Sequence, residues 1–459
     1  MRLVYYLLAG ALSAGITFGL AILIWKLSIR YRLYPKIRAR DVHTRPTPRL
    51  GGIAMFIGIG VTVAVASQFS QFHLVFARPG PVLAIFGAAL IIVLIGVADD
   101  IWDLDWMTKL AGQLIAASLL AWQGVQLTSI PIVGGVIVLS SYAGLLTTVL
   151  IIVLVMNAVN FIDGLDGLVA GVALIANVVF LIYSWILATS MAQAEYFNLA
   201  SLLTAVLIGA CVGFLPLNWH PARLFMGDAG ALLVGLLMAT SAISVTGQVD
   251  IASLQYTKQL APAFIPILLP LAVLIVPLLD FALAVIRRLR AGKSPFTADR
   301  KHLHHRLLDM GHSHFHAVLI FYAWTAVVSI GCLLFLFVQA VWAITIMAVG
   351  LVVCTWFTIA PLTRRKVAEA AVQLAETGDL EQAGAARFDP LDEAANDAPA
   401  GAHGTARETR EKDAALEALT RTASESHRPS RHDESRSQTE QNRSQTDQDS
   451  PRQKESGTA

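Results

Sequence analysis

The sequence predicts an all-α polytopic membrane protein with about eleven transmembrane helices. Of its 459 residues, 55% are hydrophobic and only 14% are charged, and the mean hydropathy is +0.61. Apolar runs of about 20 residues, long enough for a helix to cross the hydrocarbon core, recur from the N-terminus onward. More than half of the acidic residues follow Leu362. These features indicate a membrane body followed by a polar tail.

The predicted spans are separated by polar connections. They cover residues 3–25, 50–68, 81–98, 109–122, 141–158, 167–189, 198–217, 229–246, 261–285, 316–338 and 340–361. The fourth is short and only Gln339 separates the last two, so a count of ten stays open. The first has a long apolar core without a small-residue cleavage site, which indicates a retained anchor. Residues 126–140, with β-branched residues around Pro131 and with Gly134-Gly135, predict a short periplasmic hairpin.

Lys and Arg residues indicate how the spans are oriented. They gather in the connections after the first and ninth spans, whereas the opposite-side connections contain only Arg78 and Lys258. The positive-inside rule places the odd-to-even connections in the cytoplasm and the N-terminus outside, as expected for a multi-pass protein of the plasma (inner) membrane. Residues 1–363 form the predicted transmembrane domain. Residues 364–459 form a cytoplasmic tail, expected to be largely disordered because it has few large apolar residues.

Charge and cysteine content exclude other classes of protein. The 34 basic and 32 acidic residues nearly balance, and the basic ones form no sustained patch of the kind that binds nucleic acid. Cys211, Cys332 and Cys354 each stand alone in an apolar run. Their spacing fits neither a disulfide framework nor a zinc site, so we expect them to fill the core.

Five cytoplasmic connections contain nearly all the unusual polar residues, and the outward connections contain almost none. The residues concerned are Arg45 and Arg49; Asp99, Asp100, Asp103, Asp105 and Lys109; Asn157, Asn160, Asp163 and Asp166; Asn218, His220, Arg223 and Asp228; and Asp299, Arg300, Lys301, His302, His304, His305 and Arg306. The third group recurs every three residues, so its members fall roughly on one face of a helical end. The sequence therefore predicts an active site at the cytoplasmic membrane surface.

Several of these residues also have purely structural explanations. Asp228 precedes an apolar run and would be a good helix N-cap, and Asp163 and Asp166 could cap a turn. The histidine-rich segment could be a basic patch that binds anionic lipid. Asp99 and Asp100 are harder to explain in this way. Two carboxylates at a helix C-terminus are unfavourable by roughly 0.3–1 kcal/mol each unless a cation compensates them.

Taken together, the polar residues suit a diphosphate with a bound divalent cation. Magnesium is a hard cation that proteins usually hold through one or two carboxylates plus substrate phosphates. Arginine, lysine and histidine side chains suit the remaining phosphate charge. Because so much of the chain lies in the membrane, we expect one substrate to be soluble and the other to be a lipid.

In these connections the chain resembles the polyprenyl-phosphate N-acetylhexosamine-1-phosphate transferases. The resemblance extends over about Met1 to Leu362, with the motifs in the family's order. The matching runs are Arg45–Gly52, Asp99-Asp100 with Asp103 and Lys109, Asn157–Leu168, Pro221–Gly230 and Ser294–Arg306. The fifth run resembles the branch that uses UDP-N-acetylglucosamine. The tail departs from the family, as do Ala229 and Ala231, where a serine is frequent.

The resemblance implies transfer of N-acetylglucosamine 1-phosphate from UDP-N-acetylglucosamine to a polyprenyl phosphate. This step releases UMP and begins a lipid-linked cell-envelope polysaccharide. Asp228 and Asn160 would hold Mg²⁺, for which Mn²⁺ could substitute, and Asp99 and Asp100 would be catalytic at the prenyl-phosphate end. The residues expected to bind substrates are Arg45, Lys109, Asp163, Asp166, Arg300, His302, His304 and His305. Membrane lipid is a further expected partner, nucleic acid is not, and a homodimer stays open.

Two other functions compete with this one. An ion-coupled membrane transporter with interfacial acidic ion sites would have acids near the bilayer midplane and inverted repeats. Only Asp280 lies well inside a predicted span, and the two halves of the chain show no repeat. An intramembrane aspartyl protease needs two aspartates on facing helices, whereas Asp228 lies at a loop.

Overall fold

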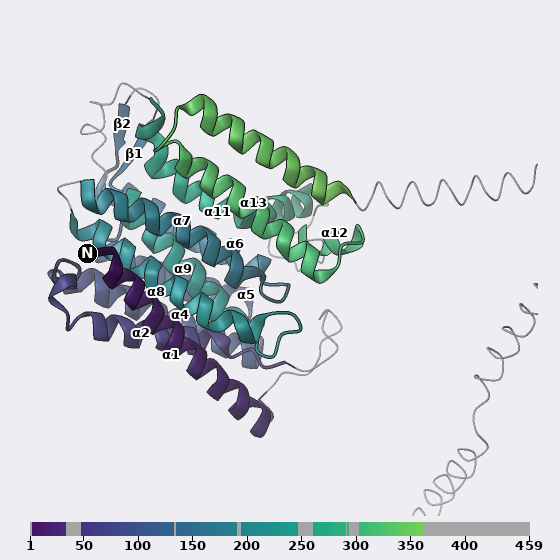
Figure 1. Ribbon diagram of the computed structural model, residues 1–459. Coiled ribbons are helices and arrows are strands. Elements are labelled where there is room, and N and C mark those ends of the chain that lie inside the picture. The colour runs from purple at the N-terminus through teal and green to yellow at the C-terminus, as the bar shows by residue number, and fades with distance from the viewer. Residues whose placement is uncertain are drawn as a thin grey trace, which may run out of the picture. The chain divides into compact units, whose positions relative to one another are not determined.

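The computed structural model is almost entirely helical in the residues it describes, which are 2–33, 47–132, 135–190, 194–246, 260–290, 292 and 303–360 (Figure 1). The elements are α1 (Arg2–Arg30), α2 (Gly51–Ala66), η1 (Ser70–Phe72), α3 (His73–Phe76), α4 (Pro79–Trp102), α5 (Trp106–Trp122), β1 (Ser129–Ile132), β2 (Gly135–Val138), α6 (Ser141–Ile162), α7 (Leu168–Ser190), α8 (Ala194–Asn218), α9 (Gly227–Thr246), α11 (Leu260–Arg290), α12 (Leu303–Asp309), α13 (His314–Leu334) and a last helix over Ala340–Ala360.

The protein is a polytopic membrane protein. Within the described residues, eight helices are long and apolar enough to cross a membrane, and a ninth span results if α2 and the residues Ser70–Phe76, bent by 100°, count as one. Each predicted span overlaps one of the helices. However, α2 has only 16 residues, α5 has 17, and α11 is not among the eight. The count of eleven and the sidedness of the connections therefore stay predictions.

Helix α9 is the centre of the bundle, surrounded by α2, α4, α6 and α8 (Figure 1). In its membrane-spanning window 89% of the residues are buried, against 22% for α1. Small residues allow this close packing, because a β-carbon at Gly52 of α2 or Gly96 of α4 would collide with the backbone of α9 at Ala229 and Gly230. The ends of α2 and α4 are thereby held against the first turn of α9.

The predicted hairpin between the fourth and fifth spans is present. Strands β1 and β2 pair antiparallel, with Ser129 opposite Val138 and Ile132 opposite Gly135. Its base is tied to α6, because Leu127 N donates to Thr148 Oγ1 at 2.9 Å. The hairpin is thus attached to the bundle at the start of α6, at the end opposite to Asn157 and Asn160.

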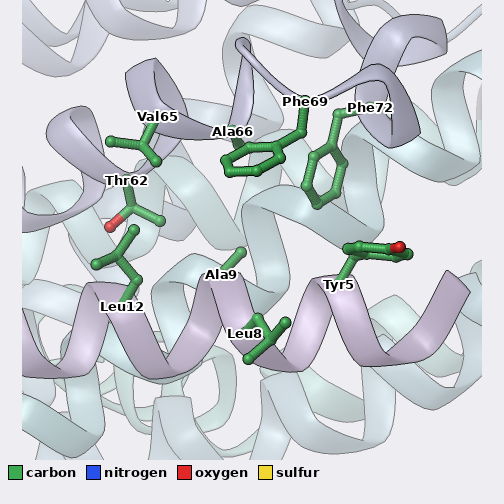
Figure 2. Close-up of a pocket in the computed structure, with 9 residues that line it drawn as sticks. All are labelled: Tyr5, Leu8, Ala9, Leu12, Thr62, Val65, Ala66, Phe69 and Phe72. Atoms are coloured by element: carbon green, nitrogen blue, oxygen red, sulfur yellow. The ribbon is translucent and has the colours of Figure 1, made fainter.

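An apolar cavity of about 200 Å³ lies between α1 and α2 (Figure 2). Its lining residues are Tyr5, Leu8, Ala9, Leu12, Thr62, Val65, Ala66, Phe69 and Phe72. The hydroxyls of Tyr5 and Thr62 are the only polar side-chain atoms drawn in this lining (Figure 2). Because the cavity contains none of the predicted site residues, the chemistry must be sought at the other end of α2, near Gly51.

Some predicted site residues cannot be placed. Arg45, Arg300 and His302 lie outside the described residues, as does the whole tail from residue 361. His304 and His305 belong to α12, but only their backbone is described. Their roles stay predictions from the sequence.

Candidate active site

A sharp turn between α4 and α5 brings Lys109 back to Asp99. Asp103 ends α4 in the left-handed conformation, at φ 56°, and its N–H donates to Asp99 O at 2.9 Å. Asp105 then caps α5, accepting from Thr108 N at 3.0 Å. The Thr108 hydroxyl also donates to this carboxylate. The two hydrogen bonds from Thr108 hold the pKa of the exposed Asp105 carboxyl below its usual range. Helix α5 therefore starts one turn before Lys109 and runs back alongside α4.

The first and fourth connections meet through their backbones. Gly51 N and Gly52 N donate to Phe225 O and Met226 O, each at 3.0 Å, and Phe225 N donates to Pro48 O at 2.8 Å. The next residue, Gly227, has φ +70°, and a side chain there would collide with Arg49 and Asp100. Only glycine fits this turn, which starts α9 directly against the end of α4.

Five residues from four helices converge at this point, and we call them the acidic centre: Asp99, Asp100, Lys109, Asn160 and Asp228. Lys109 Nζ lies 2.7 Å from Asp99 Oδ2 and 3.5 Å from Asp228 Oδ2. Asn160 Nδ2 donates to Asp228 Oδ1 at 3.1 Å, and Asp228 N donates to Asp100 Oδ1 at 3.4 Å. The structure thus brings the second, third and fourth connections together.

The acidic centre has unsatisfied oxygens. Asp99 Oδ1 and Asp100 Oδ2 are buried, and no group among the described residues donates a hydrogen bond to them. Leaving buried carboxylate oxygens without a partner is costly, and a hard cation is a suitable partner for them. The carboxylate oxygens of the acidic centre therefore fit Mg²⁺.

The same residues do not form a metal site made of protein ligands alone. Within the described part of the chain, no three histidine, cysteine, aspartate or glutamate side chains meet as metal ligands. Magnesium commonly keeps several waters and is held by one or two carboxylates together with substrate phosphates. The acidic centre therefore suits a cation that arrives with, or is completed by, a phosphorylated substrate.

Asp163 lies just beyond the end of α6 and belongs to the same charged neighbourhood. Burial raises its pKa to about 7; the negative charges of Asp228 and Asp166 add to the shift, and the positive charge of Arg49 opposes it. The charge of Arg49 also acts on Asp100. The first connection therefore contributes a cation to the site, and a bound metal ion would move the pKa of Asp163 back towards its ordinary value.

Asp166 links the third and fourth connections. Its Oδ2 accepts hydrogen bonds from His220 Nδ1 at 2.8 Å and from Ala222 N at 3.0 Å. Nearby, Asn218 Oδ1 accepts from Gly167 N and Asn218 Nδ2 donates to Leu224 O, each at 3.0 Å. One oxygen of Asp166 is thus bound to the protein itself.

Comparison with known proteins identifies the family. Residues 82–246, which include the whole acidic centre, match Glycosyl transferase family 4. The decaprenyl-phosphate N-acetylglucosaminephosphotransferase of Mycolicibacterium smegmatis is 40% identical over 361 residues, or 78% of this chain and 89% of that protein. The chain belongs to the polyprenyl-phosphate N-acetylhexosamine-1-phosphate transferase family.

The similarity extends to transferases of other bacteria. The probable undecaprenyl-phosphate N-acetylglucosaminyl 1-phosphate transferase of Bacillus subtilis is 30% identical over 65% of this chain and 76% of its own. The undecaprenyl-phosphate alpha-N-acetylglucosaminyl 1-phosphate transferase of Yersinia pestis is 29% identical over 62% and 72%. The resemblance seen in the five connections is therefore confirmed.

In this transferase one contact beside the site was not predicted from the sequence. Asn157 Nδ2 donates to Gln113 Oε1 at 2.5 Å, and Gln113 is only 3% exposed. Gln113 lies one helical turn after Lys109, and Asn157 lies one turn before Asn160. The available signal was a glutamine one turn from the site lysine, in a mostly apolar helix. The pair fixes α5 to α6 directly below the acidic centre.

Proposed function

We propose that this protein transfers N-acetylglucosamine 1-phosphate from UDP-N-acetylglucosamine to a polyprenyl phosphate, at the cytoplasmic face of the plasma membrane. The product would be the first lipid-linked intermediate of a cell-envelope polysaccharide. The observation that carries this proposal is the acidic centre at the ends of apolar helices, where Lys109, Asn160 and Asp228 meet Asp99 and Asp100. Asp99 and Asp100 each keep one buried carboxylate oxygen that no described residue satisfies. The names of the relatives supply the substrate classes.

The arrangement suggests a division of roles. Asp228, with the side-chain amide oxygen of Asn160, would hold Mg²⁺ on the diphosphate of the nucleotide sugar. The bound ion supplies charge neutralisation on that diphosphate. Lys109, between Asp99 and Asp228, would bind a phosphate oxygen, and Asp99 would orient the lysine at the prenyl-phosphate end. Mn²⁺ should substitute for Mg²⁺, because it also accepts carboxylate ligands.

We favour direct attack by the lipid phosphate. An anionic oxygen of the prenyl phosphate attacks the β phosphorus of the donor and forms the new phosphorus–oxygen bond. The bond from this phosphorus to the bridging oxygen breaks, and its electron pair leaves on UMP. A phosphate monoester is already anionic near neutral pH, so no residue has to remove a proton from it. The acidic centre supplies positioning and charge neutralisation.

The test is UMP release by purified protein supplied with UDP-N-acetylglucosamine, a polyprenyl phosphate and Mg²⁺. We expect one UMP for each lipid-linked sugar, and none when the lipid is omitted. UDP-N-acetylgalactosamine in place of the donor tests the choice of sugar. Absence of UMP with every UDP-N-acetylhexosamine would contradict the proposal. The transporter alternative has no support among the relatives.

A further inference from the structure

His220 has two side-chain contacts within the protein and yet is open to solvent. Its Nδ1 lies 2.8 Å from Asp166 Oδ2, and its ring stacks on the ring of His314, with centroids 5.2 Å apart and planes 9° apart. The two contacts fix the rotation and the plane of the imidazole. The His220 side chain is nevertheless 46% exposed, whereas that of Asp166 is 2% exposed. A buried carboxylate thus orients an accessible histidine.

The second ring nitrogen of His220 is available to a ligand. Because the carboxylate of Asp166 faces Nδ1, the proton belongs on Nδ1. Nε2 therefore presents a lone pair in the neutral ring and an N–H in the imidazolium. Among the described residues, none bonds to Nε2. Because the His220 side chain is 46% exposed, Nε2 can be reached by a ligand from solvent.

His220 lies where three of the site's connections meet. Asp166 follows Asp163, whose charge environment includes Asp228 and Arg49. His314 opens α13, which comes directly after α12 with its two predicted sugar-binding histidines. The neighbouring Trp219 packs edge-on against Phe315 at 6.0 Å, which secures the fourth connection on α13. Lys109 and Asp99, at the predicted prenyl-phosphate end, lie on α5 and α4 instead.

We propose that His220 binds an oxygen of the nucleotide-sugar donor through Nε2, and that Asp166 and His314 position its ring. The proposal rests on the proposed function and adds a substrate contact to it. It also changes the expected role of Asp166 from a donor ligand to a positioning residue. A phosphate oxygen of the donor would accept a hydrogen bond from the Nε2–H of the imidazolium, and a sugar hydroxyl could also donate one to the Nε2 lone pair of the neutral ring.

Two substitutions of His220 separate a ligand contact from a structural one. The amide of His220→Gln reaches the position of Nε2, whereas the amide of His220→Asn reaches only that of Nδ1 and keeps the bond to Asp166. We expect His220→Asn to raise the KM for UDP-N-acetylglucosamine about 10- to 100-fold, the loss of one charge-assisted hydrogen bond. His220→Gln should raise it much less, and the KM for polyprenyl phosphate should stay constant in both. The reverse order of the two variants, or an unchanged donor KM in both, would overturn the proposal.

The positioning role of Asp166 has its own test. Asp166→Leu removes the acceptor and should raise the donor KM as far as His220→Asn does. Asp166→Asn, whose amide oxygen still accepts from His220 Nδ1 and Ala222 N, should raise it much less. In the His220→Asn background, Asp166→Leu should cause little further change, because its effect passes through His220. An equal loss in both backgrounds would show that Asp166 acts by itself.

A second histidine provides the matched control. His73, in α3, is exposed and has its Nδ1 held by Ser70 O at 3.0 Å, but it lies beyond the opposite end of α2. His73→Gln and His73→Asn should leave every constant unchanged. Competitive inhibition by UMP then locates the contact. An inhibition constant that rises with the donor KM places the contact on the UMP part of the donor, and an unchanged inhibition constant places it on the N-acetylglucosamine 1-phosphate part.

Equilibrium binding of UDP-N-acetylglucosamine keeps this test independent of turnover. If the unmodified protein binds the donor but releases no UMP, the proposed function fails while His220 can still be tested by affinity. We expect the His220→Asn protein to bind the donor about 10- to 100-fold more weakly than the unmodified protein. Equal affinities would overturn the proposal for His220.

Discussion

Asp228 can be a helix cap or a metal ligand, and its surroundings distinguish the two. Helix α9 already begins at Gly227, so Asp228 lies within its first turn. Its carboxylate is bonded to Lys109 and Asn160, which come from α5 and α6. A residue whose only role was to cap α9 would instead bond to the backbone of that helix. The geometry therefore favours a role for Asp228 in binding charged groups over a role as a helix cap.

Replacing Asp228 by asparagine should abolish most of the activity. Asparagine caps a helix about as well as aspartate, so the protein should still express and insert. It lacks the negative charge, so UMP release should fall by roughly 100- to 1,000-fold, the usual effect of removing one preorganised electrostatic contact. Raising Mg²⁺ or substituting Mn²⁺ should recover part of the loss, and a chelator should stop the unmodified protein.

The matched control is Asp105→Asn. Asp105 is an exposed N-cap of α5 whose two oxygens bond to Thr108, and asparagine can replace it in that role. UMP release by this variant should remain normal. Near-normal turnover in Asp228→Asn, by contrast, would remove the metal site from the account.

At the scale of elements, the close packing of α4 against α9 holds the site together. A β-carbon on Gly96 would collide with the backbone of Ala229, so Gly96→Ala must push the helices apart and separate Asp100 from Asp228. We expect a loss of about 1–3 kcal/mol of stability, which is typical of overpacking. UMP release should fall by a larger factor than the loss of folded protein explains. Thermal unfolding and the UMP assay measure the two effects.

Gly60→Ala is the control for this substitution. Among the described residues, a β-carbon on Gly60 would meet only Phe86, at an ordinary 3.8 Å, so this variant of α2 should keep both stability and turnover. If Gly96→Ala behaves in the same way, the approach of α4 to α9 does not set the geometry of the acidic centre.

The helices could be predicted from the sequence because the bilayer fixes their length. In the part of the chain that the structure describes, eight of the apolar runs form helices long enough to span the bilayer, and the residues Pro131 and Gly134-Gly135 predicted the hairpin. The partners within the site could not be predicted by composition. Lys109 and Asp228 are 119 positions apart, and only the packing of α4, α5 and α9 brings them within 3.5 Å. For the same reason the bond from Asp166 to His220 was missed.

At the scale of the whole molecule, the orientation in the membrane is open to a direct test. A reporter fused after Arg49 or within residues 290–299 should be active in the cytoplasm, because the basic residues gather in these two connections. A reporter fused after Gly80 or Gln248 should be active outside. Reporter activity outside for a fusion near Pro295 would overturn the cytoplasmic placement of the site.

The tail should be dispensable for the reaction. No motif of the family lies beyond Leu362, and the composition of the tail cannot support a packed core. A chain that ends near Ala368 should therefore release UMP at the normal rate. A loss of turnover at an unchanged protein level would reveal a functional element in the tail.

The fate of the β phosphorus of the donor tests the central claim most directly. UDP-N-acetylglucosamine radiolabelled at this phosphorus, which bears the sugar, is supplied with polyprenyl phosphate and Mg²⁺ to the unmodified protein and to Asp228→Asn. We predict that the label moves into the lipid, that unlabelled UMP is released in equal amount, and that Asp228→Asn loses most of both activities. Label released as UDP would mean transfer of the sugar alone, and would contradict a sugar 1-phosphate transferase.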